Sequence, residues 1–417
     1  MRLRLRTDGA PKWIERLIPL IKKEIHAGAD TQGNTTSKLN DTASNAKRNK
    51  NDGTFEATLI GRTLLTASAS SKRVFNIKLQ LNSAASWEPG DMVSVTYLNN
   101  EATVDDILSR VTHSGSTDLK ANIAESLLTR DITKNGLALM KRYAQVGGNQ
   151  QLLKLVADER AAVCWAKNHP VTSLFDEFPS DLALNDLMDI FTGKNSRLYS
   201  ISNPCPSSDN IVELTVSEVR YSVCDKIRQG ACSGYLAQAP IGSKIRISIV
   251  PDPHFHMPSD SRTPMIMVAF GSAIAPFRAF LKSNTAEERS SRPTWLIFGD
   301  RSPDEDFLYR DELEQWESGG NLTRLDTVWS RYGAKHHIQD ALPEMGAELL
   351  RWLDAGAELY LCGHNRDTLQ SVQEALQTSI AIAQANASAM SVEPNNDDVE
   401  WARAYMERLR GASRIHC

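Results

Sequence analysis

The 417-residue chain has few cysteines, and the six that it has are scattered. No two of them have the C-x-x-C spacing of zinc sites and redox motifs, and their density is far below that of small disulfide-stapled domains. The pattern predicts neither a metal site nor a disulfide framework. It suits a reducing compartment, so we expect a cytoplasmic protein.

Long apolar runs and an excess of one charge are lacking as well. The longest apolar stretches, such as Met265–Phe270 and Leu359–Cys362, have the length of a strand, whereas a membrane span needs about 20 residues. No signal-peptide-like run follows the basic start of the chain. A formal net charge of -4 gives no electrostatic reason to expect nucleic acid as a partner. We expect no transmembrane segment and no nucleic-acid site.

The chain is long enough for two or three folded domains. Residues 11–26 place apolar residues at helical spacing between lysines, which predicts a basic amphipathic helix. That helix either packs locally or docks on a partner or membrane surface. Residues 27–53 are rich in Asn, Thr, Ser, Gly and Lys, so we expect a disordered linker there.

Two further regions follow the linker. Residues 54–262 read as a β domain interrupted by a helical insertion at about 100–192, because β-rich runs precede the helical pattern and resume after it. In residues 263–417, short apolar strands alternate with helical segments, one of them expected at Phe307–Glu317. That alternation predicts βαβ units and a parallel sheet, giving a multidomain α+β and α/β protein.

Two stretches of the β domain carry groups suited to a flavin cofactor. On a predicted strand, the guanidinium of Arg197 can bind phosphate, the ring of Tyr199 can stack on a flavin, and the hydroxyl of Ser200, on the other face, can hydrogen-bond flavin N5. Residues 230–233 open a helix with small side chains, an arrangement that binds phosphate through free N–H groups. Taken alone, the two stretches would more readily be interpreted as ordinary strand residues and an ordinary serine-capped helix.

The parallel-sheet region contains candidates for a dinucleotide site. Gly271 and Ser272 follow its first strand, where a doubly wound sheet binds a pyrophosphate, and Arg301 follows the second strand. Farther along the chain lies a group of residues with hydroxyl, guanidinium, ammonium and amide side chains. They form either a solvated basic edge or a site for the 2′-phosphate that distinguishes NADPH from NADH. The residues of this group are Ser330, Arg331, Lys335 and Gln339.

Cys362 ends another apolar strand, just before Gly363. A cysteine in this place is either a small buried hydrophobe or, at the mouth of a nicotinamide site, a group beside the carbon that gives up hydride.

Taken in order, these stretches resemble the ferredoxin–NADP reductase superfamily. The likeness is greatest to the C-terminal, FAD- and NADPH-binding halves of diflavin reductases of the NADPH–sulfite reductase flavoprotein type, and it runs from about residue 54 to 410. The helical insertion is the feature that separates diflavin enzymes from plain ferredoxin reductases. The strongest segments are Trp87–Asp91, Phe178–Ser180, Arg197–Ser202, Leu214–Tyr221, Gly230–Ser233, Ile274–Arg278, Asp304–Arg310 and Leu361–Gly363.

The resemblance implies an antiparallel FAD-binding barrel with a helical insertion, then a parallel-sheet NADP-binding domain. It also implies an enzyme that transfers hydride from NADPH to FAD. On the flavin side, Arg197 would contact the FAD pyrophosphate, Tyr199 would stack on the isoalloxazine and Ser200 would lie near N5. The pyrophosphate would also be held by backbone groups of Gly230, Ala231, Cys232 and Ser233.

On the nucleotide side, the resemblance implies that Gly271 and Ser272 line the NADPH pyrophosphate turn. Cys362 would sit by the nicotinamide, which makes it, with Ser200, a catalytic candidate. The remaining NADPH-binding candidates are Arg301, Ser330, Arg331, Lys335 and Gln339.

Three features depart from the family pattern. Ala269 and Ala273 stand where glycines are usual, and we expect a Cβ at Ala273 to crowd a turn that needs positive φ or close approach to phosphate. The C-terminal residues 413–417 lack the usual acidic residue and flavin-covering aromatic, which implies truncation or a differently gated nicotinamide pocket. His364 follows the Cys-Gly pair, where an acidic residue is common.

The electron acceptor is expected to be a separate protein. Diflavin enzymes carry an FMN-binding domain upstream, and residues 1–53 are too short for one, so that carrier is either separate or missing. Flavodoxin, ferredoxin or a metalloenzyme such as sulfite reductase would fit, and the chain can equally be a subunit dedicated to one such oxidoreductase. The alternative is a degenerate, weakly catalytic protein that binds flavin or a partner.

Overall fold

The computed structural model describes residues 54–111, 115–133, 135–193, 195–205, 209–223, 226–286, 292–333, 336–363, 366–387 and 394–417. The helix predicted at 11–26, the linker at 27–53, Lys335 and His364 lie outside the described residues.

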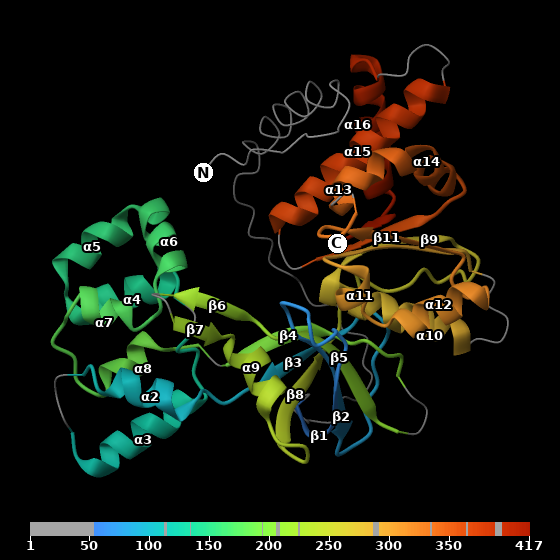
Figure 1. Ribbon diagram of the computed structural model, residues 1–417. Helices are drawn as coiled ribbons and strands as arrows, with labels where there is room; N and C mark the ends of the chain where they lie inside the picture. Colours follow the sequence, from blue (N-terminus) through green and yellow to red (C-terminus); the bar gives the residue numbers. More distant parts are fainter. Residues whose placement is uncertain are drawn as a thin grey trace, which may run out of the picture.

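The first folded region is an antiparallel sheet of strand order β4-β3-β8-β1-β2-β5 (Figure 1). A bridge between Ile201 and Leu214 links the end of β4 to β5, so the sheet curls into the predicted barrel. Apolar side chains that alternate along the strands fill its interior. The strands are β1 Thr54–Leu64, β2 Val74–Leu81, β3 Met92–Thr96, β4 Ser196–Ser200, β5 Ile211–Ser217 and β8 Lys244–Val250.

A lobe of short helices interrupts the barrel between β3 and β4 and lies to one side of it (Figure 1). It has a hydrophobic core of its own, separate from the barrel core. Its helices are α2 Glu101–Leu108, α3 Thr117–Leu128, α4 Leu137–Gly147, α5 Gln150–Ala157, α6 Glu159–Asn168, α7 Ser173–Glu177 and α8 Asp186–Ile190.

A hairpin follows β5 and was not predicted. Its strands are β6 Arg220–Val223 and β7 Lys226–Gln229, and it extends toward the helical lobe before the chain enters α9, Ala231–Gln238 (Figure 1). Each strand has only four residues and one or two apolar or aromatic ones, so the alternation is too short to predict strands.

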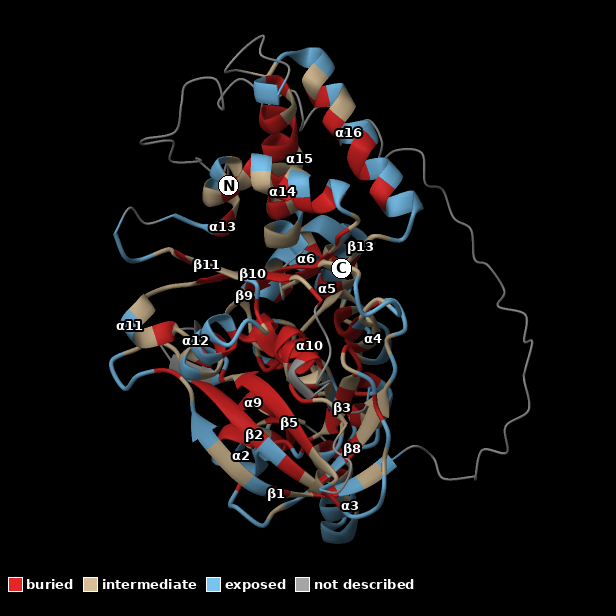
Figure 2. Ribbon diagram, turned by 90° about the vertical axis from the view of Figure 1, so that its right-hand side faces the viewer, coloured by how far each residue is buried: buried red, intermediate tan, exposed pale blue. Residues whose placement is uncertain are grey.

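The second folded region is a parallel sheet of strand order β11-β10-β9-β12-β13. Its strands are β9 Met265–Phe270, β10 Thr294–Asp300, β11 Arg324–Trp329, β12 Glu358–Cys362 and β13 Ile415–His416. Helices cover both faces, which is why the central strands are apolar at nearly every position (Figure 2). The expected parallel α/β sheet is therefore confirmed.

Alternate residues of the central strands enter two different cores. Met265, Met267 and Ala269 pack with α10 and α12, whereas Ile266 and Val268 pack with α14, α15 and α16. The helical elements are η1 Gly271–Ile274, α10 Ala275–Ala286, α11 Pro303–Asp306, α12 Arg310–Ser318, α13 Ile338–Ala341, η2 Leu342–Met345, α14 Gly346–Asp354, α15 Arg366–Ala387 and α16 Asn396–Gly411.

The helix expected at Phe307–Glu317 was wrong at its start, because α12 begins at Arg310. Tyr309 has φ of 57°, a left-handed backbone that cannot continue a right-handed helix. None of the helices in the described ranges is long and apolar enough to cross a membrane.

Candidate functional site

The candidate dinucleotide site lies where the strand order of the parallel sheet reverses. β9 is the first strand of this sheet in the chain, and it lies between β10 and β12. Ala269 is in register with Cys362, so the turn after β9 and the end of β12 are neighbours. Open parallel sheets bind ligands outside the carboxyl ends of their strands at such a reversal.

The turn after β9 is built on Gly271, which has φ of 52°. A left-handed backbone of this kind favours glycine. Ala273 lies in the 3-10 turn η1, outside the set of described residues with positive φ, and Ala269 lies within β9. The expectation that Ala273 strains this turn through positive φ was therefore wrong, because Gly271 takes up the left-handed conformation.

Three of the predicted phosphate-binding residues come together beside this turn. The backbone N–H of Ser330 donates to the Asp300 carbonyl over 2.9 Å, and that of Arg331 donates to the Arg301 carbonyl over 2.8 Å. The guanidinium groups of both arginines donate to one acceptor, the hydroxyl of Ser71, from Nη1 over 2.7 Å for Arg301 and 3.3 Å for Arg331. Two cations that share one hydroxyl are suited to a phosphate group.

Ser71 and its neighbour Lys72 were missed by the sequence reasoning. They lie in the loop between β1 and β2 of the barrel, about 230 residues before Arg301 in the chain. Lys72 pairs with Asp300 at the end of β10, and a Cβ built on Gly271 would lie 3.4 Å from its Nζ. The two adjacent cations Lys72 and Arg73 after a Ser-rich run were the sequence feature from which this loop could have been recognised as part of the site.

The other two described candidates for NADPH binding are Gln339 and Ser272. Gln339 is half-buried on α13, and no described contact joins it to the arginine cluster. Ser272 is 7% exposed, in the first turn of η1.

Cys362 ends β12, half-buried against the core that contains Phe298 and Tyr360. Burial raises the pKa of the Cys362 thiol to about 12. The thiol therefore stays protonated at neutral pH, and it offers a small, uncharged surface rather than a nucleophile.

The flavin-side candidates lie on β4 and α9. Tyr199 is paired with Val93 and Arg197 with Val95, so both side chains lie on the face of β4 that the barrel core covers. Arg197 lies over the Tyr97 ring, 5.8 Å from its centroid, and its Nη1 is 3.8 Å from Asp131 Oδ2.

Cys232, at the second position of α9, completes this cluster. Burial first, and the nearby Cys232 second, raise the pKa of the Tyr199 hydroxyl. Burial likewise raises the pKa of the Cys232 thiol to about 11, against a hydrogen bond from Tyr199 that lowers it. Both groups are therefore neutral, which leaves Arg197 and Asp131 as the charged members of the cluster.

The start of α9 has no side-chain cap. The Ser233 hydroxyl instead accepts the N–H of Val219 over 3.1 Å, so it secures the preceding segment. A Cβ on Gly230 would lie 2.8 Å from Val219 Cβ, which explains the glycine by packing. The first N–H groups of α9 are thus the part of residues 230–233 that is suited to an anion.

Ser200 lies on the opposite face of β4 from Tyr199. It shares that face with Leu198, which is 55% exposed. The structure therefore keeps the predicted arrangement, in which the tyrosine ring and the serine hydroxyl point to different sides of one strand.

A buried ion network fixes the barrel to the parallel-sheet domain. Arg278 of α10 is 3% exposed and donates to Glu312 of α12 through Nε and Nη2, over 2.7 Å each. Its Nη1 donates to the barrel, over 2.8 Å to Glu213 and 3.0 Å to the Ser202 carbonyl. This network joins the segment that follows β4 to α10, the helix that comes directly after the Gly271 turn.

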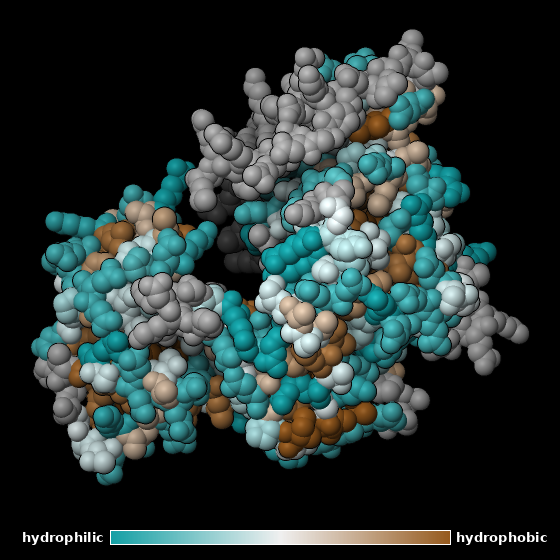
Figure 3. Space-filling view, in the orientation of Figure 1, coloured by the Kyte–Doolittle hydropathy of each residue, from teal (hydrophilic) through white to brown (hydrophobic). Residues whose placement is uncertain are grey.

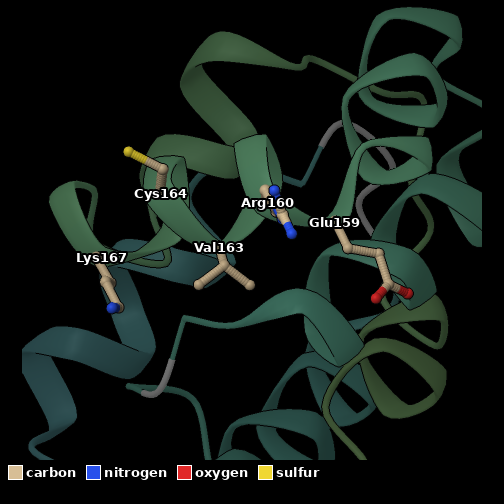
Figure 4. Close-up of a pocket in the computed structure, with 5 residues that line it drawn as sticks. All are labelled: Glu159, Arg160, Val163, Cys164 and Lys167. Atoms are coloured by element: carbon tan, nitrogen blue, oxygen red, sulfur yellow. The ribbon is translucent and has the colours of Figure 1, made fainter. Parts of the chain in front are cut away.

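One other hollow of the surface is less suited to a cofactor. Glu159, Arg160, Val163, Cys164 and Lys167 line this shallow hollow along α6 (Figure 4). All five come from one helix, so no second element converges on a ligand there. The molecule is also hollowed between the helical lobe and the parallel-sheet domain (Figure 3).

The fold and these clusters together define a two-domain oxidoreductase of the ferredoxin–NADP reductase type. Residues 267–374 match the family of oxidoreductase NAD-binding domains. Over nearly all of its length the chain is also similar to larger flavoproteins.

Three relatives illustrate this similarity, each a sulfite reductase [NADPH] flavoprotein alpha-component. The Yersinia enterocolitica protein is 31% identical over 98% of this chain and 67% of its own length. The Photorhabdus laumondii protein is 32% identical over 98% of this chain and 69% of its own length. The Yersinia pestis protein is 33% identical over 84% of this chain and 57% of its own length.

The chain belongs to this family of NADPH-dependent flavoprotein reductases. Membership confirms the expected superfamily and the oxidoreductase class. The chain spans between 57% and 69% of the length of the three relatives described.

Proposed function

We propose that this chain carries electrons from NADPH, through FAD, to a separate acceptor protein. One observation carries the proposal. The carboxyl ends of β9 and β12 are neighbours, with the Gly271 turn on one and Cys362 on the other, in a domain locked to the barrel by Arg278. The names of its relatives support a sulfite reductase component as the acceptor, with flavodoxin or ferredoxin as other candidates.

The flavin site would be formed by β4 and the start of α9. Arg197 would exchange its distant partner Asp131 for the FAD pyrophosphate, which the N–H groups of residues 231–233 would also bind. Tyr199 would stack on the isoalloxazine, and Ser200 would place its hydroxyl near N5. The neutral Tyr199 and Cys232 fit this site because they add no negative charge beside the pyrophosphate.

The NADPH site would be formed by the ends of the parallel strands. Gly271 and Ser272 would line the pyrophosphate, and Cys362 would lie beside the nicotinamide as a protonated thiol. The 2′-phosphate would bind Arg301, Ser330, Arg331, Lys335 and Gln339. When bound, the two cofactors supply the hydride transfer itself, while the protein supplies orientation and exclusion of water.

The domain division and the location belong to the same proposal. We divide the chain into an N-terminal segment 1–53, a flavin-binding barrel 54–262 and an NADP-binding domain 263–417, which the ends of β8 at Val250 and the start of β9 at Met265 support. The scattered cysteines support the cytoplasm.

The positive φ at Gly271 favours this proposal over a degenerate, weakly catalytic protein. Restoring glycines with Ala269→Gly and Ala273→Gly distinguishes the two. We expect no gain in NADPH oxidation, because neither alanine occupies a left-handed position. A large gain would support the degenerate alternative.

The first test is a visible spectrum of the purified chain, followed by NADPH without oxygen. We expect flavin bands that bleach on addition of NADPH. A yellow protein that does not bleach would favour the degenerate alternative. A colourless protein that takes up no added FAD would refute the proposal.

A further inference from the structure

The loop between β1 and β2 of the barrel contacts α11 and the carboxyl end of β10. The N–H of Ala67 donates to the Glu305 carbonyl over 2.8 Å, and the Ser70 hydroxyl donates to Asp306 over 2.6 Å. Ser71 and Lys72 follow in the same loop. The barrel thereby places an ammonium group directly at the dinucleotide turn.

The end of β10, next to this loop, carries two groups that favour different nucleotides, Asp300 and Arg301. A carboxylate near the end of the second strand accepts a hydrogen bond from the ribose 2′-hydroxyl of NAD, whereas an arginine accommodates the 2′-phosphate of NADP. Asp300 ends β10, the second strand of this sheet, and Arg301 follows it at once. An unpaired Asp300 would favour NADH and repel the phosphate of NADPH.

Lys72 forms an ion pair with the Asp300 carboxylate. Its Nζ contacts both oxygens of Asp300, and the two side chains are only 15% and 4% exposed. The Arg301 N–H donates to the same carboxylate over 2.8 Å. Burial raises the pKa of Asp300 and Lys72 opposes that rise, so the ammonium favours a paired carboxylate. Arg301 and Arg331 turn instead to the Ser71 hydroxyl and remain suited to a phosphate.

We propose that Lys72 is a specificity-determining residue: a lysine supplied by the flavin-binding barrel neutralises Asp300 and makes the site select NADPH over NADH. The inference rests on the proposed function, since it concerns the same nucleotide site. It adds that coenzyme preference depends on a contact between the two domains. Neither domain alone carries the complete selectivity.

The test uses the full chain with FAD and two probes, adenosine 2′,5′-bisphosphate and AMP, which differ only in the 2′-phosphate. Binding is measured by calorimetry, and flavin bleaching is measured with NADPH and NADH. We expect Lys72→Met to weaken binding of the bisphosphate by about 10- to 100-fold, the range of a charge-assisted interaction. AMP binding should change little, and the bleaching rates should shift toward NADH.

The double variant Lys72→Met/Asp300→Asn separates neutralisation from a direct phosphate contact. We expect it to recover most of the bisphosphate affinity, because the repelling carboxylate is gone. Arg73→Met is the matched control: it removes the adjacent cation, which pairs with Glu218 inside the barrel, 3.2 Å away. It should leave both probes unaffected.

Two results would overturn the inference. One is equal weakening of both probes by Lys72→Met, and the other is a double variant that recovers nothing. If Lys72→Met does not fold, Asp300→Asn decides alone: it must bind the bisphosphate at least as tightly as the parent, and a tenfold loss refutes the inference. A parent chain that binds neither probe and bleaches with neither nucleotide would instead refute the proposed function.

Discussion

The barrel meets the parallel-sheet domain at two charged junctions that differ in what holds them. At the inner junction, Arg278 is 3% exposed, is paired with Glu213 and Glu312, and lies over the Tyr309 ring at 4.3 Å. At the outer junction, Lys72 pairs with Asp300 at the edge of the dinucleotide turn. One junction lies within the protein, and the other borders the site.

The difference shows how one interface can serve two purposes. Around Arg278 the bonds run between protein groups: Arg278 pairs with Glu213 and Glu312, Asn76 donates to Glu213 over 2.9 Å, and the hydroxyls of Thr215 and Tyr309 are 2.7 Å apart. At the outer junction, Arg301 and Arg331 share a single neutral hydroxyl, so an incoming phosphate gives them a stronger partner.

Breaking the inner junction should have the largest effect. Arg278→Met removes the buried cation that pairs with Glu213 and Glu312 and leaves Glu213 with Lys282, 3.6 Å away; removing one partner of a buried pair costs about 3–5 kcal/mol. The loss should appear as a lower free energy of unfolding in urea. Arg262→Met is the control, because the Arg262 side chain is 83% exposed and its pair with Asp260 lies at the surface. A variant as stable as the parent would show that the network is dispensable.

Acid should weaken the same junction. Burial alone would raise the pKa of Glu213, but Arg278, Lys282 and the hydrogen bond from Asn76 outweigh it and lower the pKa from 4.5 to about 2. A lowered pKa stabilises the folded state above the unfolded value, and that stability is lost as the pH falls through the folded value.

Parent and Glu213→Gln should therefore differ in free energy of unfolding by about 2–3 kcal/mol at neutral pH. The difference should shrink as the pH falls from about 4.5 to 2. Urea titrations at several pH values measure it. Glu159→Gln, whose side chain is 65% exposed, should show no such trend. A constant difference across this range would mean that Glu213 is not the titrating group.

The order of these elements could be predicted from the sequence because it depends on local patterns. Apolar strands alternating with helices marked the parallel sheet, and the positions of Arg197, Tyr199, Arg301 and Arg331 followed from strand ends and spacing. Helical periodicity likewise marked the lobe between β3 and β4.

The outer junction could not be predicted in this way. Lys72 and Asp300 are 228 residues apart, so no periodicity or motif joins them. The left-handed backbone at Tyr309 also has no local signature, since glycine and asparagine are the usual residues there. Long-range contacts of this kind depend on how the finished domains pack.

Changing the arginines beside the outer junction should affect NADPH binding more than the stability of the fold. Arg331→Ala removes one of the two guanidinium groups at Ser71, and we expect the KM for NADPH to rise about 10- to 100-fold, with little change for NADH. Steady-state kinetics with both nucleotides measure this. Arg351→Ala, which removes a surface pair with Glu348, should change neither. Equal effects on both nucleotides would sink the assignment of a 2′-phosphate site.

The smallest expected effect concerns a third contact, where β13 meets the segment joining the two domains. His416 stacks on Tyr360 with ring centroids 4.3 Å apart. Its Nε2 lies 2.8 Å from Glu358, and its Nδ1 lies 2.9 Å from the His254 carbonyl oxygen. Burial lowers the pKa of His416, but these hydrogen bonds outweigh it and raise the pKa above 6.5.

A raised pKa means that this contact stabilises the fold fully below pH 6.5, and that the stability is lost as the pH rises through the folded value. Hydrogen exchange of the β13 amides should therefore speed up from pH 6 to 9 beyond the intrinsic rate. The change in opening free energy should be about 0.5–1 kcal/mol, as for a partly exposed pair. His416→Gln should abolish this excess and the exposed His336→Gln should keep it, whereas the same excess in both would assign it to another group.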